Sequence, residues 1–532
     1  MTARLGRLGR IAAAAALLAG CGGAPQPAPT ASAGTVVPMP AAVLRWGAPR
    51  FVPGAGQGVV LDFAGNDGVT HAGYVRADGS GFRCLTCGPG FADLSIGRPA
   101  PFGDGHRVLV QSPAASNGIQ KLSFLVIECA GSVASCAHPV VRAVTGTQAP
   151  DSLQDRVGLI SPDGSTLVWT RIRRDGFLLL AGRLTRAGAG YQVRDIRVLN
   201  APADRAATDV AGLARADAWY EAKSFAPDGQ SITFAATIAG SLNLDSYLMD
   251  LRTGAVRRLT DDPDWDEGLE ISPDGRSFAQ ASSRGGNITA AFGNLPRPPV
   301  LDLAAITVLN YFTPRRTGAT EPYRRGAQRQ PYVFGIVGEP DGHDAVALAT
   351  ASDTGWYVND WPDWSADGSL LVWAQARPAR PEIRQVRTAR APVRPGPPVR
   401  AVATPSPHWA PAISAVPVAA PGLRRVIAGP DGGNARVEMT GDLLAGFFAV
   451  TYVNYRDGCT VLDGHQTVRT DRRLDTTYRE KLTMTGCHTG TSTVDVVVHG
   501  AQGAGQGSAT STYDGRTRTT TLTPTPATSA PS

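Results

Sequence analysis

The sequence has little lysine and few aromatic residues for its length. Only three of its 51 basic residues are lysine (Lys121, Lys223 and Lys481), and aromatic residues make up 7% of the 532 residues. A nucleic-acid-binding surface needs basic residues clustered on one face, whereas the formal charge of +6 is carried mostly by scattered arginine. The composition therefore argues against a nucleic-acid partner, and it excludes a disordered chain, a collagen and a coiled coil.

The sequence also lacks the short motifs that carry most enzyme chemistry. It contains no G-x-S-x-G nucleophile elbow, no H-E-x-x-H metal motif, no P-loop and no G-x-G-x-x-G ahead of a helix. Its eight histidines show no pairing at metal-ligand spacing. We therefore expect no catalytic residues, no cofactor and no metal, and we favour a non-enzymatic protein.

Long apolar runs are missing too, apart from a short one near the start. Three arginines (Arg4, Arg7 and Arg10) precede an apolar run from Ile11 to Ala19, which is too short to cross a bilayer of about 30 Å. A basic segment followed by a short apolar run is typical of an export signal. We expect residues 1–20 to be a signal peptide.

The signal ends in Leu18-Ala19-Gly20-Cys21, which resembles the bacterial lipobox. The resemblance implies a lipid on the Cys21 sulfur and cleavage that leaves Cys21 as the new N-terminus. Residues 21–42 would then be the lipidated cysteine and a flexible tether, and the protein would lie in the bacterial cell envelope, held at a membrane by its lipid. An ordinary secretory signal with a chance cysteine is the alternative.

Cysteine is scarce: the chain has seven, and six remain once Cys21 is set aside for lipidation. Six cysteines in an exported protein indicate disulfides, and proximity in sequence predicts the pairs Cys84–Cys87, Cys129–Cys136 and Cys459–Cys487. The C-x-x-C spacing of the first pair also fits a thioredoxin-type redox motif, but the following Gly88-Pro89-Gly90 starts no helix. A structural zinc site needs four ligands, and no partnered cysteine or histidine pair is evident.

A turn followed by a strand recurs between residues 43 and 390. The four strong copies are SPDG, APDG, SPDG and SADG, which begin at Ser161, Ala226, Ser272 and Ser365; weaker copies begin at Val52 and Phe102. Aspartate suits the centre of a tight turn, and glycine takes the positive φ that closes it. Each repeat is long enough for a four-stranded sheet, and sheets arranged radially cover each other's faces.

These turns, and the hairpin pattern D-L-x-x-G-x-x-x-x-L-T at Asp250 to Thr260, resemble the repeats of TolB-like, WD-type β-propellers. The resemblance covers residues 43–390. It implies a six-bladed propeller and a protein or peptide partner in an envelope assembly. The long gap between Asp274 and Asp367 departs from the pattern and leaves a seventh blade open.

The rest of the chain changes character twice. Residues 391–421 are rich in proline, which indicates an extended linker. Residues 422–518 alternate apolar and polar residues, which predicts a small antiparallel β-sandwich or barrel-like domain, and residues 519–532 are rich in Thr, Pro and Ser, as in a disordered tail. The predicted fold class is all-β: a six-bladed, alternatively seven-bladed, β-propeller followed by this C-terminal β-domain.

Three short segments with aromatic and acidic residues occupy the same register ahead of successive turns. In a propeller this register lies where the innermost strand begins, so we expect the three segments to line one mouth of the central channel. The alternative is that the tryptophans pack between blades and the acids are solvated. The predicted binding residues are Trp219, Tyr220, Glu221, Trp265, Asp266, Glu267, Asp360 and Trp361.

Together these features predict a membrane-anchored envelope lipoprotein whose propeller is a scaffold or a protein- or peptide-binding module. One alternative is a propeller enzyme, such as a polysaccharide lyase, lactonase or other hydrolase, with its site in the central channel. Another is a glycan- or cell-wall-binding protein that stacks sugars on Tyr452 and Tyr455. An enzyme needs converging acid, base or metal ligands, and a scaffold does not.

Overall fold

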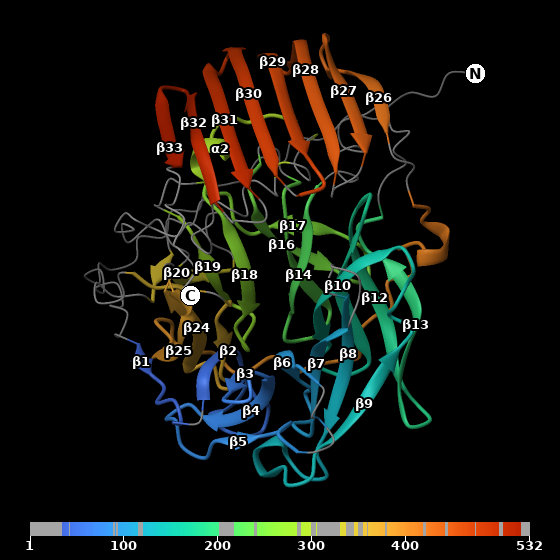
Figure 1. The fold of residues 1–532 in the computed structure, drawn as a ribbon, viewed down its shortest axis with the longest axis vertical. Coiled ribbons are helices and arrows are strands. Elements are labelled where there is room, and N and C mark those ends of the chain that lie inside the picture. Colours follow the sequence, from blue (N-terminus) through green and yellow to red (C-terminus); the bar gives the residue numbers. More distant parts are fainter. Residues whose placement is uncertain are drawn as a thin grey trace, which may run out of the picture. The chain divides into compact units, whose positions relative to one another are not determined.

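Strands dominate the computed structural model, so the predicted all-β fold class is confirmed (Figure 1). Cys21 and the predicted signal peptide lie outside the described residues, all of which belong to one compact unit, Ala31–Ser532. The described residues are 34–41, 43–88, 91, 94–114, 121–201, 218–238, 242–284, 289–298, 300, 305, 330–336, 345–348, 355–358, 360–377, 380–418, 422–441, 445–473, 475–499 and 504–522.

Three groups of four strands, each antiparallel within itself, follow one another from Val43 to Val198. The first contains β2 (Val43–Phe51), β3 (Gly58–Gly65), β4 (Thr70–Arg76) and β5 (Arg83–Cys84). The second contains β6 (Gly97–Pro101), β7 (Arg107–Ala114), β8 (Lys121–Glu128) and β9 (Val140–Thr145), with the short helix η2 (Val133–Ser135) before β9. The third contains β10 (Ser152–Ile160), β11 (Thr166–Arg173), β12 (Gly176–Ala187) and β13 (Gly190–Val198). A short parallel pairing of β9 with β13 joins the last two groups into one eight-stranded sheet.

Three further antiparallel groups complete this region. The fourth contains β14 (Tyr220–Phe225), β15 (Ser231–Ala236), β16 (Asp245–Asp250) and β17 (Val256–Arg258). The fifth contains β18 (Asp266–Ile271), β19 (Ser277–Ser282), β20 (Gln330–Gly335) and β21 (Val346–Ala347). The last contains β22 (Tyr357–Val358), β23 (Asp363–Trp364), β24 (Leu370–Arg377), β25 (Arg380–Arg390) and β1 (Thr35–Val36). Because β1 pairs with β25, a strand from the predicted tether completes the last sheet.

The inner strands of neighbouring groups contact each other in a closed cycle. The contacts run from β2 to β6, β10, β14, β18 and β23, and β23 contacts β2 again. Apolar side chains fill the space between neighbouring sheets: Trp46 and Leu61 of the first group, for example, pack with Val372 and Val386 of the last. Each sheet therefore buries its faces against the sheets on either side of it.

The repeated turns join the first two strands of a group and share one hydrogen-bond pattern. Gly275 has a φ of 72°, as the positive-φ position of the turn requires. The Ser272 hydroxyl donates to Asp274 at 2.6 Å and accepts the Ser277 N–H at 2.9 Å. The turns that begin at Ser161 and Ser365 repeat both bonds. The remaining strong copy has Ala226 in the serine position and so lacks this hydroxyl.

The segment predicted as a free linker, residues 391–421, is instead packed along these turns over its described part, residues 391–418. Gly396 N–H donates to the Asp274 carboxylate at 2.7 Å, and Thr404 N–H donates to the Asp163 carboxylate at 2.8 Å. Farther on, the Trp409 indole donates to Leu251 O at 2.9 Å, and the short helix η4 (Ile413–Ala415) follows. We call residues 391–418 the strap. Proline-rich chain stays extended, which lets the few remaining N–H groups reach acceptors on successive turns.

The C-terminal region contains one eight-stranded antiparallel sheet in the described residues, not the two facing sheets of a sandwich. Each strand pairs with the next along the chain. The last strand reaches Leu522, so the first residues of the predicted disordered tail, 519–532, are in a strand. The strands are β26 (Leu423–Ala428), β27 (Asn434–Gly441), β28 (Gly446–Asp457), β29 (Thr460–Thr470), β30 (Thr476–Gly486), β31 (Gly490–His499), β32 (Ala504–Tyr513) and β33 (Arg516–Leu522).

An insertion between β19 and β20 covers the apolar face of this C-terminal sheet. It includes helix α2 (Ala290–Gly293), and its Phe292 stacks on Tyr478 with ring centroids 6.2 Å apart. Leu295 and Val300 pack into the same face beside Val437 and Val450. Period-two alternation predicts that one face of a sheet is buried, but it does not say what buries it. This ambiguity explains why the sequence pattern was compatible with a sandwich.

We expect Ser272→Ala to lower the free energy of unfolding by about 1–2 kcal/mol, because the buried Ser277 N–H loses its acceptor. Ala226→Ser supplies the hydroxyl that the fourth turn lacks and is expected to act in the opposite direction. Urea midpoints of both variants, compared with wild type, check this. Equal midpoints for Ser272→Ala and wild type would show that the hydroxyl contributes nothing to the turn.

Candidate functional site

A cavity of about 270 Å³ lies where the inner strands end, which are the first strand of each of the first five groups and β23 in the last group. Each group contributes the residue that closes its inner strand and the residue before it. The closing residues are Phe51, Pro101, Ile160, Phe225, Ile271 and Trp364, and the preceding residues are Arg50, Ala100, Leu159, Ser224, Glu270 and Asp363. The cavity is therefore built from one register position repeated around the cycle, and its lining combines apolar residues with four charged ones.

The charged groups that line the cavity come from four strands, β2, β14, β18 and β23. Arg50 of β2 forms an ion pair with Asp360 at 3.3 Å, and its guanidinium lies 4.6 Å from the centre of the Trp361 ring. Asp363 accepts the Phe51 N–H at 2.6 Å. Glu270 lies near both Arg50 and Asp363. Two carboxyl groups and one guanidinium thus share a small, partly closed space.

Lys223 adds a second cation, which an ion-pair network holds in place. Its ammonium lies 2.6 Å from the Glu221 carboxylate and 3.2 Å from the Glu267 carboxylate, and its side chain is 1% exposed. Arg156 pairs with the other oxygen of Glu221 at 2.5 Å. The Lys223 ammonium also lies 5.3 Å from the centre of the Trp361 ring, within the range of a cation–π interaction. A buried lysine needs such partners to stay charged.

The acids of the cavity have raised pKa values. Burial raises the pKa of Asp363 to about 6, although Arg50 opposes the shift. Burial, followed by the charge of Asp363, raises the pKa of Glu270 well above its ordinary value. The negative charge of each carboxylate opposes ionisation of the other, which adds to the effect of burial on the pKa of Glu270.

The structure brings together some of the predicted binding residues and separates others. Glu221, Glu267, Asp360 and Trp361 meet around Lys223 and Arg50, as the segments just described show. Tyr220 instead packs in an apolar core with Phe234. Asp266 is buried and pairs with Arg284 at 3.1 Å.

Two more of the predicted residues, Trp219 and Trp265, pack in a core and also contact the Lys223 network. The Lys223 ammonium lies 5.7 Å from the centre of the Trp219 ring, and the Trp265 indole donates to Glu267 at 2.9 Å. The two tryptophan rings lie 6.2 Å apart, and both belong to an apolar cluster that includes Val494 and Val496 of the C-terminal sheet. Tyr452 and Tyr455, the proposed sugar-stacking residues, are also buried in a core, at 2% and 3% exposure. Neither tyrosine offers a free face to a glycan.

The cavity residues Arg50, Lys223, Glu270 and Asp363 were not identified from the sequence, because the aromatic and acidic segments that predicted a site lie at or before the start of the inner strands, whereas the cavity lies at or near their end. A usable signal was present. Glu270 and Asp363 each stand directly before the apolar residue that precedes a repeated turn. Aligning the repeats on their turns would have placed both acids in one register.

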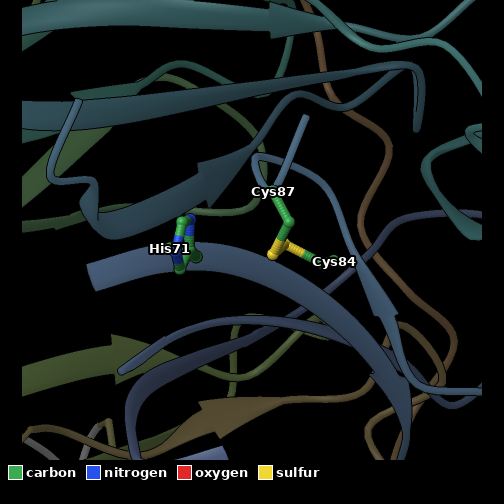
Figure 2. Close-up of side chains that lie close together, drawn as sticks. All are labelled: His71, Cys84 and Cys87. Atoms are coloured by element: carbon green, nitrogen blue, oxygen red, sulfur yellow. A yellow bond between two sulfur atoms is a disulfide. The ribbon is translucent and has the colours of Figure 1, made fainter. Parts of the chain in front are cut away.

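A separate cluster lies at the edge of the first group, where the structure pairs Cys84 with Cys87. Figure 2 shows His71 of β4 beside this disulfide. The structure also pairs Cys129 with Cys136 and Cys459 with Cys487, so all the pairs match those predicted.

The sequence matches no protein-family model and no curated protein. Similar solved structures include a putative TolB from Agrobacterium tumefaciens (17% identity, 56% of this chain and 74% of that chain, TM-score 0.33) and TolB from Acinetobacter baumannii (14%, 65% and 63%, 0.34). A puromycin-hydrolyzing peptidase of Mycobacterium tuberculosis is similar at 13% identity, over 77% of this chain and 62% of that chain, with a TM-score of 0.35. Since TolB proteins and an enzyme both occur among them, the likeness favours no single function.

None of the helices in the described part of the chain has the length and apolar character that a membrane crossing requires.

We expect Asp363→Asn to stabilise the protein at neutral pH. The pKa of Asp363 is about 6 in the folded protein, against an ordinary value of 3.8, so ionisation costs folding stability as the pH rises from about 4 to 6. The variant removes this cost. Its free energy of unfolding should exceed that of wild type by about 3 kcal/mol above pH 7, and the gain should disappear near pH 4.

Asp367→Asn is the matched control, because hydrogen bonds from Ser365 and Ser369 lower the pKa of Asp367. A carboxylate with a lowered pKa stabilises the fold at neutral pH, so this variant should lose stability there. Denaturant midpoints measured from pH 4 to pH 8 compare the two. A gain for Asp363→Asn that does not change with pH would contradict the burial of its charge.

Proposed function

We propose that the closed cycle of sheets is a six-bladed β-propeller that acts as a peptide- or protein-binding module of the bacterial envelope. The cyclic contacts of the inner strands support six blades, and so does the pairing of β1 with β25, which closes the last sheet with a strand from the start of the region. Such closure is how a propeller protects its sheet edges.

The observation that carries the binding function is the pair of carboxyl groups in the cavity at the centre of this cycle. Arg50 and Lys223 already have acidic partners in Asp360, Glu221 and Glu267. Glu270 and Asp363 face the cavity with raised pKa values. A cationic group that enters the cavity would displace the protons of Glu270 and Asp363 and form ion pairs with the two carboxylates. These ion pairs would offset the cost of burying the negative charges.

The size and rim of the cavity define the ligand further. Pockets for drug-sized ligands are typically about 300–1,000 Å³, and this cavity, at about 270 Å³, is just below that range. It suits an N-terminal ammonium group or a single basic side chain. Phe225, Ile271 and Trp364 on the rim would contact the adjoining apolar residue of the same peptide.

One alternative has an observation in its favour. Paired carboxyl groups with raised pKa values are also a feature of acid–base enzymes, in which one group donates a proton and the other accepts one. Glu270 and Asp363 would then be the acid and the base, and the substrate would bind in the same cavity. Incubation with envelope peptides and polysaccharides distinguishes the two: an enzyme forms product, and Glu270→Gln abolishes it.

Binding of short peptides tests the proposal directly. We expect the full chain to prefer peptides with a free N-terminus or a basic side chain over acetylated, neutral ones, and to bind them about tenfold more weakly at pH 5 than at pH 7. Glu270→Gln combined with Asp363→Asn should weaken binding at least tenfold. Isothermal titration measures both effects, and the proton release that accompanies binding is read from the dependence on buffer.

Asp367→Asn again serves as the control, because its carboxylate is held in the turn beside the cavity by Ser365 and Ser369. It should bind like wild type. If neutral and cationic peptides bind equally well, and the double variant changes neither, the cavity is not the peptide site.

We also propose that Cys21 carries the lipid that holds the protein at a membrane. The basis is the lipobox-like end of the signal segment, which supplies a cysteine with small residues before it. Cys21→Ser should lose incorporation of labelled fatty acid and move the protein from the membrane fraction to the aqueous fraction. Unchanged fractionation of this variant would leave the lipid anchor without support.

A further inference from the structure

His71 lies beside the Cys84–Cys87 disulfide, and this arrangement differs from that of a disulfide with a purely structural role. Among the described residues, this is the one cluster of at least three potential metal ligands, and its ligand atoms all lie within 4.8 Å of one another. Tetrahedral zinc holds thiolate and imidazole ligands at about 2.3 and 2.0 Å, so its ligand atoms are about 3.5–3.8 Å apart. The three side chains therefore need only small movements to surround one ion (Figure 2).

Both ring nitrogens of His71 have polar partners in the oxidised protein. One ring nitrogen, Nε2, lies 2.9 Å from the Asp67 carboxylate. The other, Nδ1, lies 3.2 Å from the carbonyl oxygen and 3.3 Å from the hydroxyl of Thr86, which stands between the two cysteines in the chain, and Nδ1 must exchange these contacts for the metal. A carboxylate on one nitrogen and the metal on the other is the usual arrangement of a zinc-bound histidine. The ring is 5% exposed and so is held firmly.

We propose that reduction of the Cys84–Cys87 disulfide converts this cluster into a zinc site made of Cys84, Cys87 and His71 Nδ1, with Asp67 orienting the histidine. Three protein ligands leave a fourth position for water. The sequence hid the site because His71 lies on the neighbouring strand β4 and shows no ligand spacing to the cysteines.

The chemistry of the switch needs a dithiol reductant. A dithiol transfers two electrons and two protons to the disulfide, which yields two thiols on this chain and a disulfide on the reductant. Zinc then displaces the two thiol protons and binds the two thiolates. Cys87 is solvent-exposed, so an external thiolate can reach its sulfur.

The consequence for the fold is an exchange of one cross-link for another. The disulfide joins the end of β5 to the bend that follows, beside strand β4. Zinc would tie the same bend to β4 directly through His71. The edge of the first sheet would then stay closed under oxidising and under reducing conditions, as long as zinc is present.

The second short disulfide, Cys129–Cys136, provides an internal control. It also closes a short loop, with a separation of seven residues, yet no histidine or carboxylate joins it in a cluster of ligands among the described residues. Reduction opens both disulfides, and only the first is expected to bind zinc.

The test is zinc and cobalt binding by the full chain before and after reduction by a dithiol that is then removed. The reduced protein should bind one zinc ion per chain, and the oxidised protein none. Cobalt should give a thiolate-to-metal charge-transfer band. Zinc X-ray absorption should show two sulfur ligands at about 2.3 Å, with nitrogen and oxygen completing the shell.

Variants assign the ligands. His71→Ala and Asp67→Asn should each weaken zinc binding by about 10- to 100-fold, and Cys84→Ser with Cys87→Ser should abolish it. Cys129→Ser with Cys136→Ser should leave the affinity unchanged. Circular dichroism of each reduced variant monitors folding, and the X-ray absorption of the wild-type protein identifies the ligands if His71→Ala does not fold. A shell of four sulfurs, or full affinity in His71→Ala, would overturn the proposal.

Discussion

The narrow space between the inner strands is the constraint on which the rest of this structure depends. Each sheet buries its faces against its neighbours, so the inner strands meet around a common centre. Charged side chains that point into this centre have little water to solvate them and need partners from other strands. Lys223 has two carboxylates within 3.2 Å, and Arg50 has Asp360 at 3.3 Å. This network of ion pairs links the strands to one another, in addition to positioning the charged residues of the cavity.

At the cavity end of the inner strands, opposite charges compensate the buried charges only in part. Glu270 and Asp363 both interact electrostatically with Arg50, and burial of their negative charge raises the pKa of both. The turns that frame the cavity behave in the opposite way. Asp274, for example, accepts bonds from Ser272 and Gly396, and its pKa is lowered. Glu270, whose pKa is raised by burial, and Asp274, whose pKa is lowered by hydrogen bonds, are therefore only a few residues apart, at the end of β18 and in the turn that follows it.

Local signals in the sequence were sufficient for the turns, the strands that follow them and the disulfide partners, because all of these depend on residues close together in the chain. Register also brought Glu221, Glu267 and Trp361 into one predicted group, and these residues do meet. It failed for Tyr220 and Asp266, which occupy the same segments but point to the other face of the strand, since successive side chains alternate. His71 was out of reach because its proximity to Cys84 depends on the pairing of β4 with β5.

The C-terminal sheet shows a longer-range dependence that no local pattern contains. Its apolar face is covered by Phe292, Leu295 and Val300, which belong to an insertion in the fifth group of strands. A buried ion pair joins the same two parts: Arg297 lies 3.2 Å from Glu480, and both side chains are almost fully buried. Removing either part would expose the apolar face and leave one of these charges without its partner, and each of these is costly. Residues of the insertion therefore bury part of the apolar face of the C-terminal sheet, and the strap that leads to the sheet is packed on the turns. These contacts and this ion pair couple the C-terminal sheet to the fifth group of strands.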